Sequence, residues 1–270
     1  MDLAAGYNNR ALVPDHPQII ARWRADAEAF RAVARADFDI AYGARSRNRL
    51  DLFHPAQDCR GPLVVFIHGG YWRSFDKSVF SHMARGANVH GLTVAIPSYT
   101  LCPEVSLPEI IDEMRQCCLF LARQHGGRLV VAGHSAGGHL AACMAATDWS
   151  HFGADAGLIR AGMSVSGLFD LRPLLATPVN DDIRLTPATA AAASPLLWPV
   201  PQTMGFDSWV GGAESGEFIR QARSLAAAWT GLGLTVPYVE VPGVNHFTVV
   251  NDLADPDSAM TRRLVALTRG

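Results

Sequence analysis

The chain has 270 residues, of which 49% are apolar and 18% are charged, so it can bury a large core and is excluded from the disordered class over most of its length. A formal net charge of −2 argues against nucleic acid as a partner, because no broad basic surface is available to bind phosphates. No secretory signal and no apolar run near ~20 residues is visible, so we expect no membrane contact. Five irregularly spaced cysteines fit a reducing compartment, and the sequence predicts a cytoplasmic protein.

The N-terminal part of the chain shows a helical pattern followed by two short strands. A helix is predicted over residues 17–34, inside an N-terminal helical segment that covers 1–35. Residues 38–42 and 49–53 are typical of strands, and the alternation in the second indicates an antiparallel edge. Such an edge could pair across a homodimer.

From residue 63 onward, apolar runs alternate with helical patterns. Strands are predicted at 63–67, 92–96, 129–132, 163–165, 204–210 and 236–241, and helices at 74–89, 108–125, 135–147, 217–232 and 256–268. This alternation predicts an α/β fold with a mostly parallel sheet and helices on both faces. Residues 171–201 interrupt it with six prolines and an alanine run. We interpret them as a short lid over the carboxyl edge of the sheet, within one domain spanning 1–270.

A candidate nucleophile follows the apolar run 129–132. Ligands of open parallel sheets bind outside the carboxyl ends of the strands, and here the chain continues with Gly-His-Ser-Ala-Gly at 133–137. The pattern G-x-S-x-G between a strand and a helix places the serine on a sharp turn, where the two glycines avoid collisions. Free amides at the helix N-terminus can stabilise negative charge there. Ser135 is therefore the predicted nucleophile.

A serine needs a base to remove its proton, and ten histidines are available. His246 follows the last predicted strand, which matches the chain order serine, acid, histidine of folds that contain this turn. His134 and His139 flank the nucleophile on the same turn and helix, where packing is the simpler role. Five others fall at element ends and are expected to be solvated, namely His54, His82, His90, His125 and His151. His246 is the predicted base.

The acid that orients the histidine should lie in the loop after the next-to-last strand. Glu214 sits in that loop and is the favoured candidate. Glu217 falls in the first turn of the next helix, where the helix dipole explains a carboxylate. Asp207 is expected inside the strand, and Asp170, which follows an earlier strand, remains the main alternative.

Acyl transfer also needs hydrogen-bond donors for the oxyanion. After the strand 63–67 the chain reads His-Gly-Gly-Tyr-Trp at 68–72, and the two glycines let backbone amides face a substrate. We expect the amides of Gly70, Tyr71 and Ala136 to be the donors. The bulky Tyr71 and Trp72 suggest a site for flat rings. Three residues near these turns are expected to line the substrate pocket: Gly69, Trp72 and His134.

These features together resemble an α/β-hydrolase. More narrowly, the segment 68–72 resembles the HGGxW motif of the kynurenine formamidase (arylformamidase) group, which is related to hormone-sensitive-lipase-like esterases. Further similarities at 7–10, 42–53, 166–173, 214–218 and 245–247 extend the resemblance over nearly the whole chain. It implies the same roles for Ser135, His246, Gly70 and Tyr71. The family's acid is commonly aspartate, whereas here the matching residue is Glu214, whose extra methylene demands a backbone offset.

The sequence therefore predicts a serine hydrolase that works through an acyl-enzyme on a small-molecule substrate. The first-choice substrate is an aryl formamide such as N-formylkynurenine, and the alternative is a short-acyl ester or thioester. A minor alternative is a hydrolase homologue that binds a small molecule without turnover. No cofactor and no metal are predicted, because no Cys/His cluster has ligand spacing.

Overall fold

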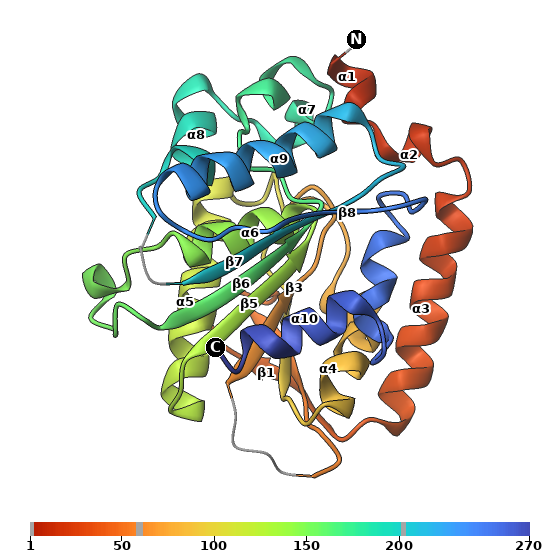
Figure 1. The fold of residues 1–270 in the computed structure, drawn as a ribbon, viewed down its shortest axis with the longest axis vertical. Coiled ribbons are helices and arrows are strands. Elements are labelled where there is room, and N and C mark those ends of the chain that lie inside the picture. The colour runs from red at the N-terminus through yellow and green to blue at the C-terminus, as the bar shows by residue number, and fades with distance from the viewer. Residues whose placement is uncertain (1–2, 58–61, 201–203) are drawn as a thin grey trace.

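A mixed sheet of eight strands organises the computed structural model, which describes residues 3–57, 62–200 and 204–270 (Figure 1). The strand order is β1-β2-β4-β3-β5-β6-β7-β8. The strands are β1 (Ala36–Ala41), β2 (Arg49–Phe53), β3 (Leu63–Ile67), β4 (Val94–Pro97), β5 (Leu129–His134), β6 (Ile159–Val165), β7 (Gly205–Gly211) and β8 (Tyr238–Val241). Strand β2 is antiparallel to both neighbours, β1 and β4, and the remaining pairs are parallel. The predicted fold and antiparallel edge are confirmed.

Helices cover both faces of this sheet. The α-helices are α1 (Leu3–Gly6), α2 (Asn9–Leu12), α3 (His16–Val33), α4 (Arg85–Val89), α5 (Leu107–His125), α6 (Ala136–Ala145), α7 (Asn180–Ile183), α8 (Pro187–Ala192), α9 (Gly216–Gly231) and α10 (Ala259–Leu267). The 3₁₀ helices are η1 (Lys77–Ala84), η2 (Trp149–Phe152), η3 (Arg172–Ala176), η4 (Pro195–Leu197) and η5 (Val249–Ala254). None of the helices in the described ranges is both long and apolar enough to cross a bilayer.

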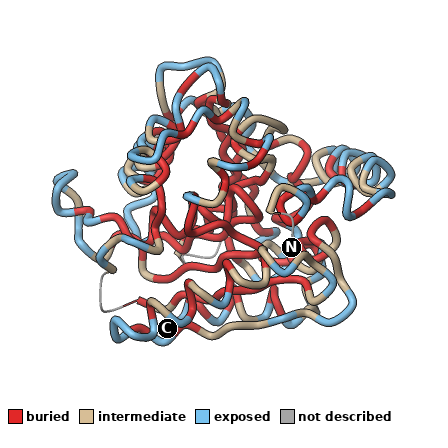
Figure 2. The backbone as a smooth tube through the Cα atoms, turned by 90° about the horizontal axis from the view of Figure 1, so that it is seen from above, coloured by how far each residue is buried: buried red, intermediate tan, exposed pale blue. Residues whose placement is uncertain are grey.

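The central strands are buried on both sides, which explains their continuous apolar runs. Along β5, Val130 and Ala132 face a core formed with α3, η1, η5 and α10, whereas Leu129 and Val131 face a second core formed with α5, α6 and α9. Figure 2 shows these buried strands between layers whose outer surfaces are exposed. The sheet is thus fixed rigidly from both faces, and its carboxyl edge is a stable platform for a site.

Most predicted elements are confirmed, with shifts at their ends. The predicted helix 74–89 is α-helical only over α4. Residues 74–76 form a loop, and Asp76 caps the start of the 3₁₀ helix η1 by accepting a hydrogen bond from the Ser78 amide. The short helices α1 and α2 inside the predicted N-terminal segment carry too few residues for a periodic pattern. His82 was expected to be solvated, but packing of η1 against α3 leaves it only 4% exposed.

The predicted lid consists of η3, α7, α8 and η4. Figure 1 shows α7 and α8 near α9, at the end of the sheet where the parallel strands finish. Ile183, Leu185 and Ala190 of this segment are buried in the same core as α5, α6 and α9. The segment is therefore packed against the body of the fold. Its last predicted residue, Pro201, lies outside the described residues, as do Met1 and Asp2 of the N-terminal segment and Cys59.

Candidate active site

Ser135 lies on the sharp turn between β5 and α6. Its backbone angles are φ 56° and ψ −119°, a region that a serine adopts only when the surroundings enforce it. The Ser135 amide donates to the Val165 carbonyl at 2.8 Å, which ties the turn to the neighbouring strand. A Cβ atom at Gly133 would lie 2.1 Å from the Gly137 oxygen, and one at Gly137 would lie 1.9 Å from the Ile67 oxygen. Glycine is thus the residue that fits at both positions of the motif.

His246 lies next to this serine. Its Nε2 is 3.0 Å from Ser135 Oγ, and its Nδ1 is 2.6 Å from Glu214 Oε2. Ser135 and His246 are 3% and 5% exposed, so the three groups interact away from bulk water. The Asn245 side chain accepts hydrogen bonds from the amides of Phe247 and Thr248, at 2.9 and 3.1 Å, and so shapes the histidine loop.

Glu214 is held from both sides. While Oε2 faces His246, Oε1 accepts a hydrogen bond from the Gly211 amide at 2.7 Å and another from the Ser166 hydroxyl. The Glu214 side chain is fully buried. The chain turns back at this point, because the Glu214 amide donates to the Gly211 carbonyl at 3.1 Å. This turn accommodates the extra methylene of glutamate and aims its carboxylate at the imidazole.

The three other acids considered from the sequence are each paired with an arginine. Asp170 binds Arg172 at 2.8 Å, and this hydrogen bond lowers the pKa of Asp170 despite partial burial. The remaining pairs are Glu217 with Arg220 at 2.8 Å and Asp207 with Arg263 at 2.7 Å. Each acid is occupied in a structural ion pair. The structure brings Glu214, and not these acids, into contact with His246.

The glycine-rich turn after β3 has an unusual backbone. Gly70, Tyr71 and Trp72 all have positive φ, at 115°, 49° and 55°. A Cβ atom at Gly70 would lie 2.4 Å from the Ser74 oxygen, so this turn requires glycine. In the described ranges, the amides of Gly70, Tyr71 and Ala136 donate no hydrogen bond to the protein. Three backbone donors near Ser135 are thus available to a ligand.

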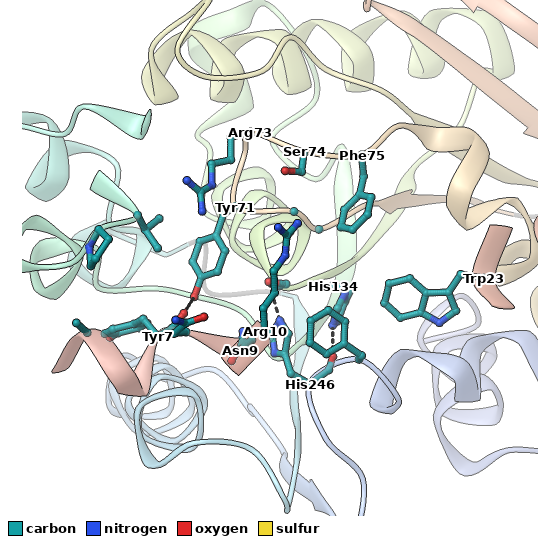
Figure 3. A pocket seen from close by; sticks show the side chains of 18 of the residues that line it. Tyr7, Asn9, Arg10, Trp23, Tyr71, Arg73, Ser74, Phe75, His134 and His246 are labelled. Carbon is teal, nitrogen blue, oxygen red and sulfur yellow. Dashed lines mark hydrogen bonds between the residues drawn. The ribbon is translucent and has the colours of Figure 1, made fainter. Parts of the chain in front are cut away.

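A cavity of about 460 Å³ opens beside Ser135 and His246 (Figure 3). Gly69 and His134 line it, as predicted from the sequence. The prediction for Trp72 was wrong. Trp72 is fully buried and packs edge-on against His139, with ring centroids 5.0 Å apart, because the turn sends it into the core and only Tyr71 into the cavity. The aromatic residues along the wall are Tyr7, Trp23, Tyr71, Phe75, Phe80 and Phe247.

His134 supports the site without competing for the proton of Ser135. Burial, followed by the neighbouring His246, lowers the pKa of His134 well below its usual value, so its ring is neutral. Its Nε2 donates to the His246 carbonyl at 2.8 Å. This bond leaves Nδ1 as an unprotonated acceptor, and it anchors the loop that carries His246.

Residues 3–12, which we call the N-terminal roof, close one side of the cavity. The sequence indicated only a similarity at 7–10, not this location. The roof is attached to α9, because the Tyr7 hydroxyl donates to Glu217 Oε2 at 2.9 Å and accepts from Gln221 Nε2 at 2.9 Å. Ser215 Oγ also donates to the Gly6 carbonyl at 2.6 Å. Burial raises the pKa of Tyr7 to about 12, so this tyrosine stays protonated as a donor.

The arrangement matches a known family. A family model described as the alpha/beta hydrolase fold matches residues 64–250. The chain belongs to the α/β-hydrolase family. Among relatives of this α/β-hydrolase are kynurenine formamidases of Salmo salar, 31% identical over 89% of this chain and 84% of the relative, and of Danio rerio, 29% identical over 90% and 86%.

Solved structures similar to this α/β-hydrolase include other hydrolases. A protein from Silicibacter sp. tm1040 with a provisional thioesterase designation is 39% identical, with a TM-score of 0.90 and full coverage of both chains. A hyperthermophilic esterase from Pyrobaculum calidifontis has a TM-score of 0.77 at 20% identity, covering 96% of this chain and 93% of the esterase. At that identity the second likeness concerns the fold alone.

Proposed function

We propose that this α/β-hydrolase is a serine hydrolase that removes the formyl group from an N-formylated aromatic amine such as N-formylkynurenine. The hydrogen-bonded chain from Ser135 through His246 to Glu214, at the wall of an aromatic cavity, carries the proposal. The similarity to the kynurenine formamidases of two fishes supports the substrate class.

The proposed reaction begins with Ser135. His246 Nε2 takes the hydroxyl proton while Oγ attacks the formyl carbon, and the carbonyl oxygen becomes an oxyanion. The free amides of Gly70, Tyr71 and Ala136 are the proposed donors to that oxygen. Glu214 accepts the Nδ1 proton of His246 in a hydrogen bond and stabilises the imidazolium that forms.

Collapse of the tetrahedral intermediate breaks the C–N bond. His246 gives its proton to the departing nitrogen, so the aromatic amine leaves neutral and the formyl ester of Ser135 remains. Water then attacks this ester and passes a proton to His246. The ester bond breaks, formate leaves, and the proton returns to Ser135 Oγ.

A hydrolase of short-acyl esters or thioesters is the second candidate. It is favoured by the 39% identity to the Silicibacter protein with the thioesterase designation. The same three residues would serve this reaction, because only the leaving group differs.

The decisive measurement compares kcat/KM for N-formylkynurenine, N-acetylkynurenine, p-nitrophenyl acetate and a short-acyl thioester. We expect N-formylkynurenine to exceed the other three by at least ~100-fold, since a discrimination of about 2.7 kcal/mol lies within the range of a shaped acyl site. A clear preference for the ester or thioester would replace the formamidase proposal by the second candidate. Binding without turnover of any of the four compounds would contradict both.

A further inference from the structure

The charges around the cavity are unequal. Its described lining residues include two arginines, Arg10 and Arg73, and no aspartate or glutamate. Arg73 forms an ion pair with Asp182 of α7. Arg10 has no ion pair or hydrogen bond within the described ranges, although Figure 3 shows its side chain extending into the space that Tyr71, Phe75 and His246 surround.

An exposed arginine without a partner does not by itself indicate a ligand, because many surface arginines are solvated. Its neighbour Asn9 provides an independent observation. Asn9 also lines the cavity but is only 5% exposed, and its Nδ2 has no hydrogen-bond partner among the residues that the structure describes. Buried polar groups are nearly always satisfied, so an unsatisfied donor at a cavity wall points to an acceptor on a ligand.

In the part of the chain that the structure describes, the nearby carboxylates do not compensate Arg10. Glu214 lies behind His246 and is bound to it, and Glu217 is held by Arg220 and by the Tyr7 hydroxyl. Asp182 is engaged by Arg73. One cationic group and one neutral donor on the same short segment are therefore left facing the cavity.

These two donors match a particular ligand group. A guanidinium presents its N–H groups in a planar fork that fits the two oxygens of a carboxylate, and an added amide N–H can satisfy a further lone pair. The aromatic residues that line the same cavity accommodate flat rings. The formyl group needs little of the roughly 460 Å³ volume, so the leaving group occupies most of it.

We propose that Arg10, together with Asn9, binds a carboxylate on the leaving-group half of the substrate. The enzyme then selects aromatic acyl compounds that carry a carboxylate over those in which this group is uncharged. This inference rests on the proposed function in one respect, namely that Ser135 marks the reacting end of the cavity. The backbone on either side of Arg10 is held in place, because Asn8 Oδ1 accepts a hydrogen bond from the Ala11 amide at 3.2 Å and Tyr71 donates to the Tyr7 carbonyl at 2.7 Å.

The test uses matched substrate pairs in which the carboxylate is replaced by an uncharged carboxamide of similar size. One pair is N-formylkynurenine and its carboxamide. The others are 2-, 3- and 4-acetoxybenzoate, each against its carboxamide, because esters report on the same cavity if formamides are not hydrolysed. The variants are Arg10→Gln and Asn9→Ala, with Arg73→Gln as the control, since that arginine is already paired.

The wild type should prefer the member that carries the carboxylate in at least one pair. Arg10→Gln should lower kcat/KM for that member by ~10–100-fold, mainly through KM, and leave the carboxamide member within about twofold. Asn9→Ala should give a smaller loss with the same selectivity. Arg73→Gln should change both members of a pair alike.

Two outcomes would overturn the proposal. One is an equal loss for both members in Arg10→Gln, which would indicate a purely structural role. The other is a wild type that does not distinguish the members of any pair. Titration calorimetry with 4-hydroxybenzoate gives the same comparison without turnover, since Arg10→Gln should weaken its binding by a similar factor. If formamides are not cleaved but the ester preference depends on Arg10, the formamidase proposal fails and this inference stands.

Discussion

The proposed catalytic residues and the N-terminal roof are built in different ways. Ser135, Glu214 and His246 follow the ends of β5, β7 and β8, and hydrogen bonds to neighbouring backbone or side chains fix each of them. The roof consists of two four-residue helices and depends on side-chain contacts with α9. The family match covers 64–250 and so excludes the roof. The proposed chemistry and the proposed selectivity are thus assigned to separate parts of the chain.

Ser135→Ala gives the largest expected effect and separates the two regions most clearly. Removing the nucleophile should lower kcat/KM by at least ~10⁴-fold on every substrate, because both steps of the reaction pass through its oxygen. Binding of 4-hydroxybenzoate should change little, since the roof is untouched. Hydrolysis at a rate close to that of the wild type would refute the mechanism.

Glu214→Gln should have the second-largest effect, a loss of ~10³–10⁴-fold in kcat. The reason is that the His246 imidazolium is no longer stabilised and its ring tautomer is no longer fixed. Asp170→Asn is the matched control, since Asp170 binds Arg172 and not His246. It should retain kcat within about threefold. The opposite ranking in steady-state kinetics would transfer the role of the acid to Asp170.

Acid should lower the stability of the fold through two buried histidines beside the central sheet, His68 after β3 and His139 on α6. Burial lowers the pKa of His68 and of His139 to about 4, whereas both titrate near 6.5 when unfolded. Between these values the unfolded chain binds protons that the folded chain excludes. The free energy of unfolding should therefore fall as the pH drops from about 6.5 to 4, by up to ~1.4 kcal/mol per pH unit for each histidine.

Urea unfolding at pH 7, 6 and 5 measures this dependence. His68→Gln should be less stable at pH 7, because it loses the ring that stacks between Phe80 and Tyr99. Its stability should decline less steeply with acid, because the unfolded variant no longer binds a proton at this position. Parallel declines in the two proteins would show that His68 does not resist protonation in the fold.

Tyr7→Phe should have the smallest effect and should act on the roof alone. The variant loses the hydroxyl that joins the roof to Glu217 and Gln221, at a cost of about 1 kcal/mol for each net hydrogen bond. We expect KM to rise by ~3–10-fold and kcat to stay within twofold. Tyr238→Phe is the control, because its hydroxyl also binds a glutamate, Glu240, but away from the cavity. A fall in kcat with unchanged KM would contradict the division between the two regions.

The sequence predicts the serine turn well because its geometry is local. Gly133 and Gly137 are required by contacts within a few residues and with one neighbouring strand. The spacing of glycines in the motif therefore predicts the turn. The position of Glu214 could also be predicted from the order of the strands. Its second contact could not, since the Ser166 hydroxyl comes from a residue 48 positions away.

The roof and the direction of Trp72 lay beyond the sequence for physical reasons. A helix of four residues shows no amphipathic period and owes its stability to tertiary contacts. The contact that holds it joins Tyr7 to Glu217 across 210 positions. The motif at 68–72 likewise placed Tyr71 and Trp72 in a turn, but only the backbone angles decide which ring enters the cavity.

The Glu214 carboxylate connects the ends of three strands. It touches Ser166 after β6, Gly211 at the end of β7 and His246 in the loop after β8. Any change in the spacing of these strands is therefore transmitted to the imidazole as a rotation or a shift. The orientation of the His246 ring therefore depends on the native arrangement of β6, β7 and β8. On heating, we expect activity to disappear together with the strand structure and not at a lower temperature.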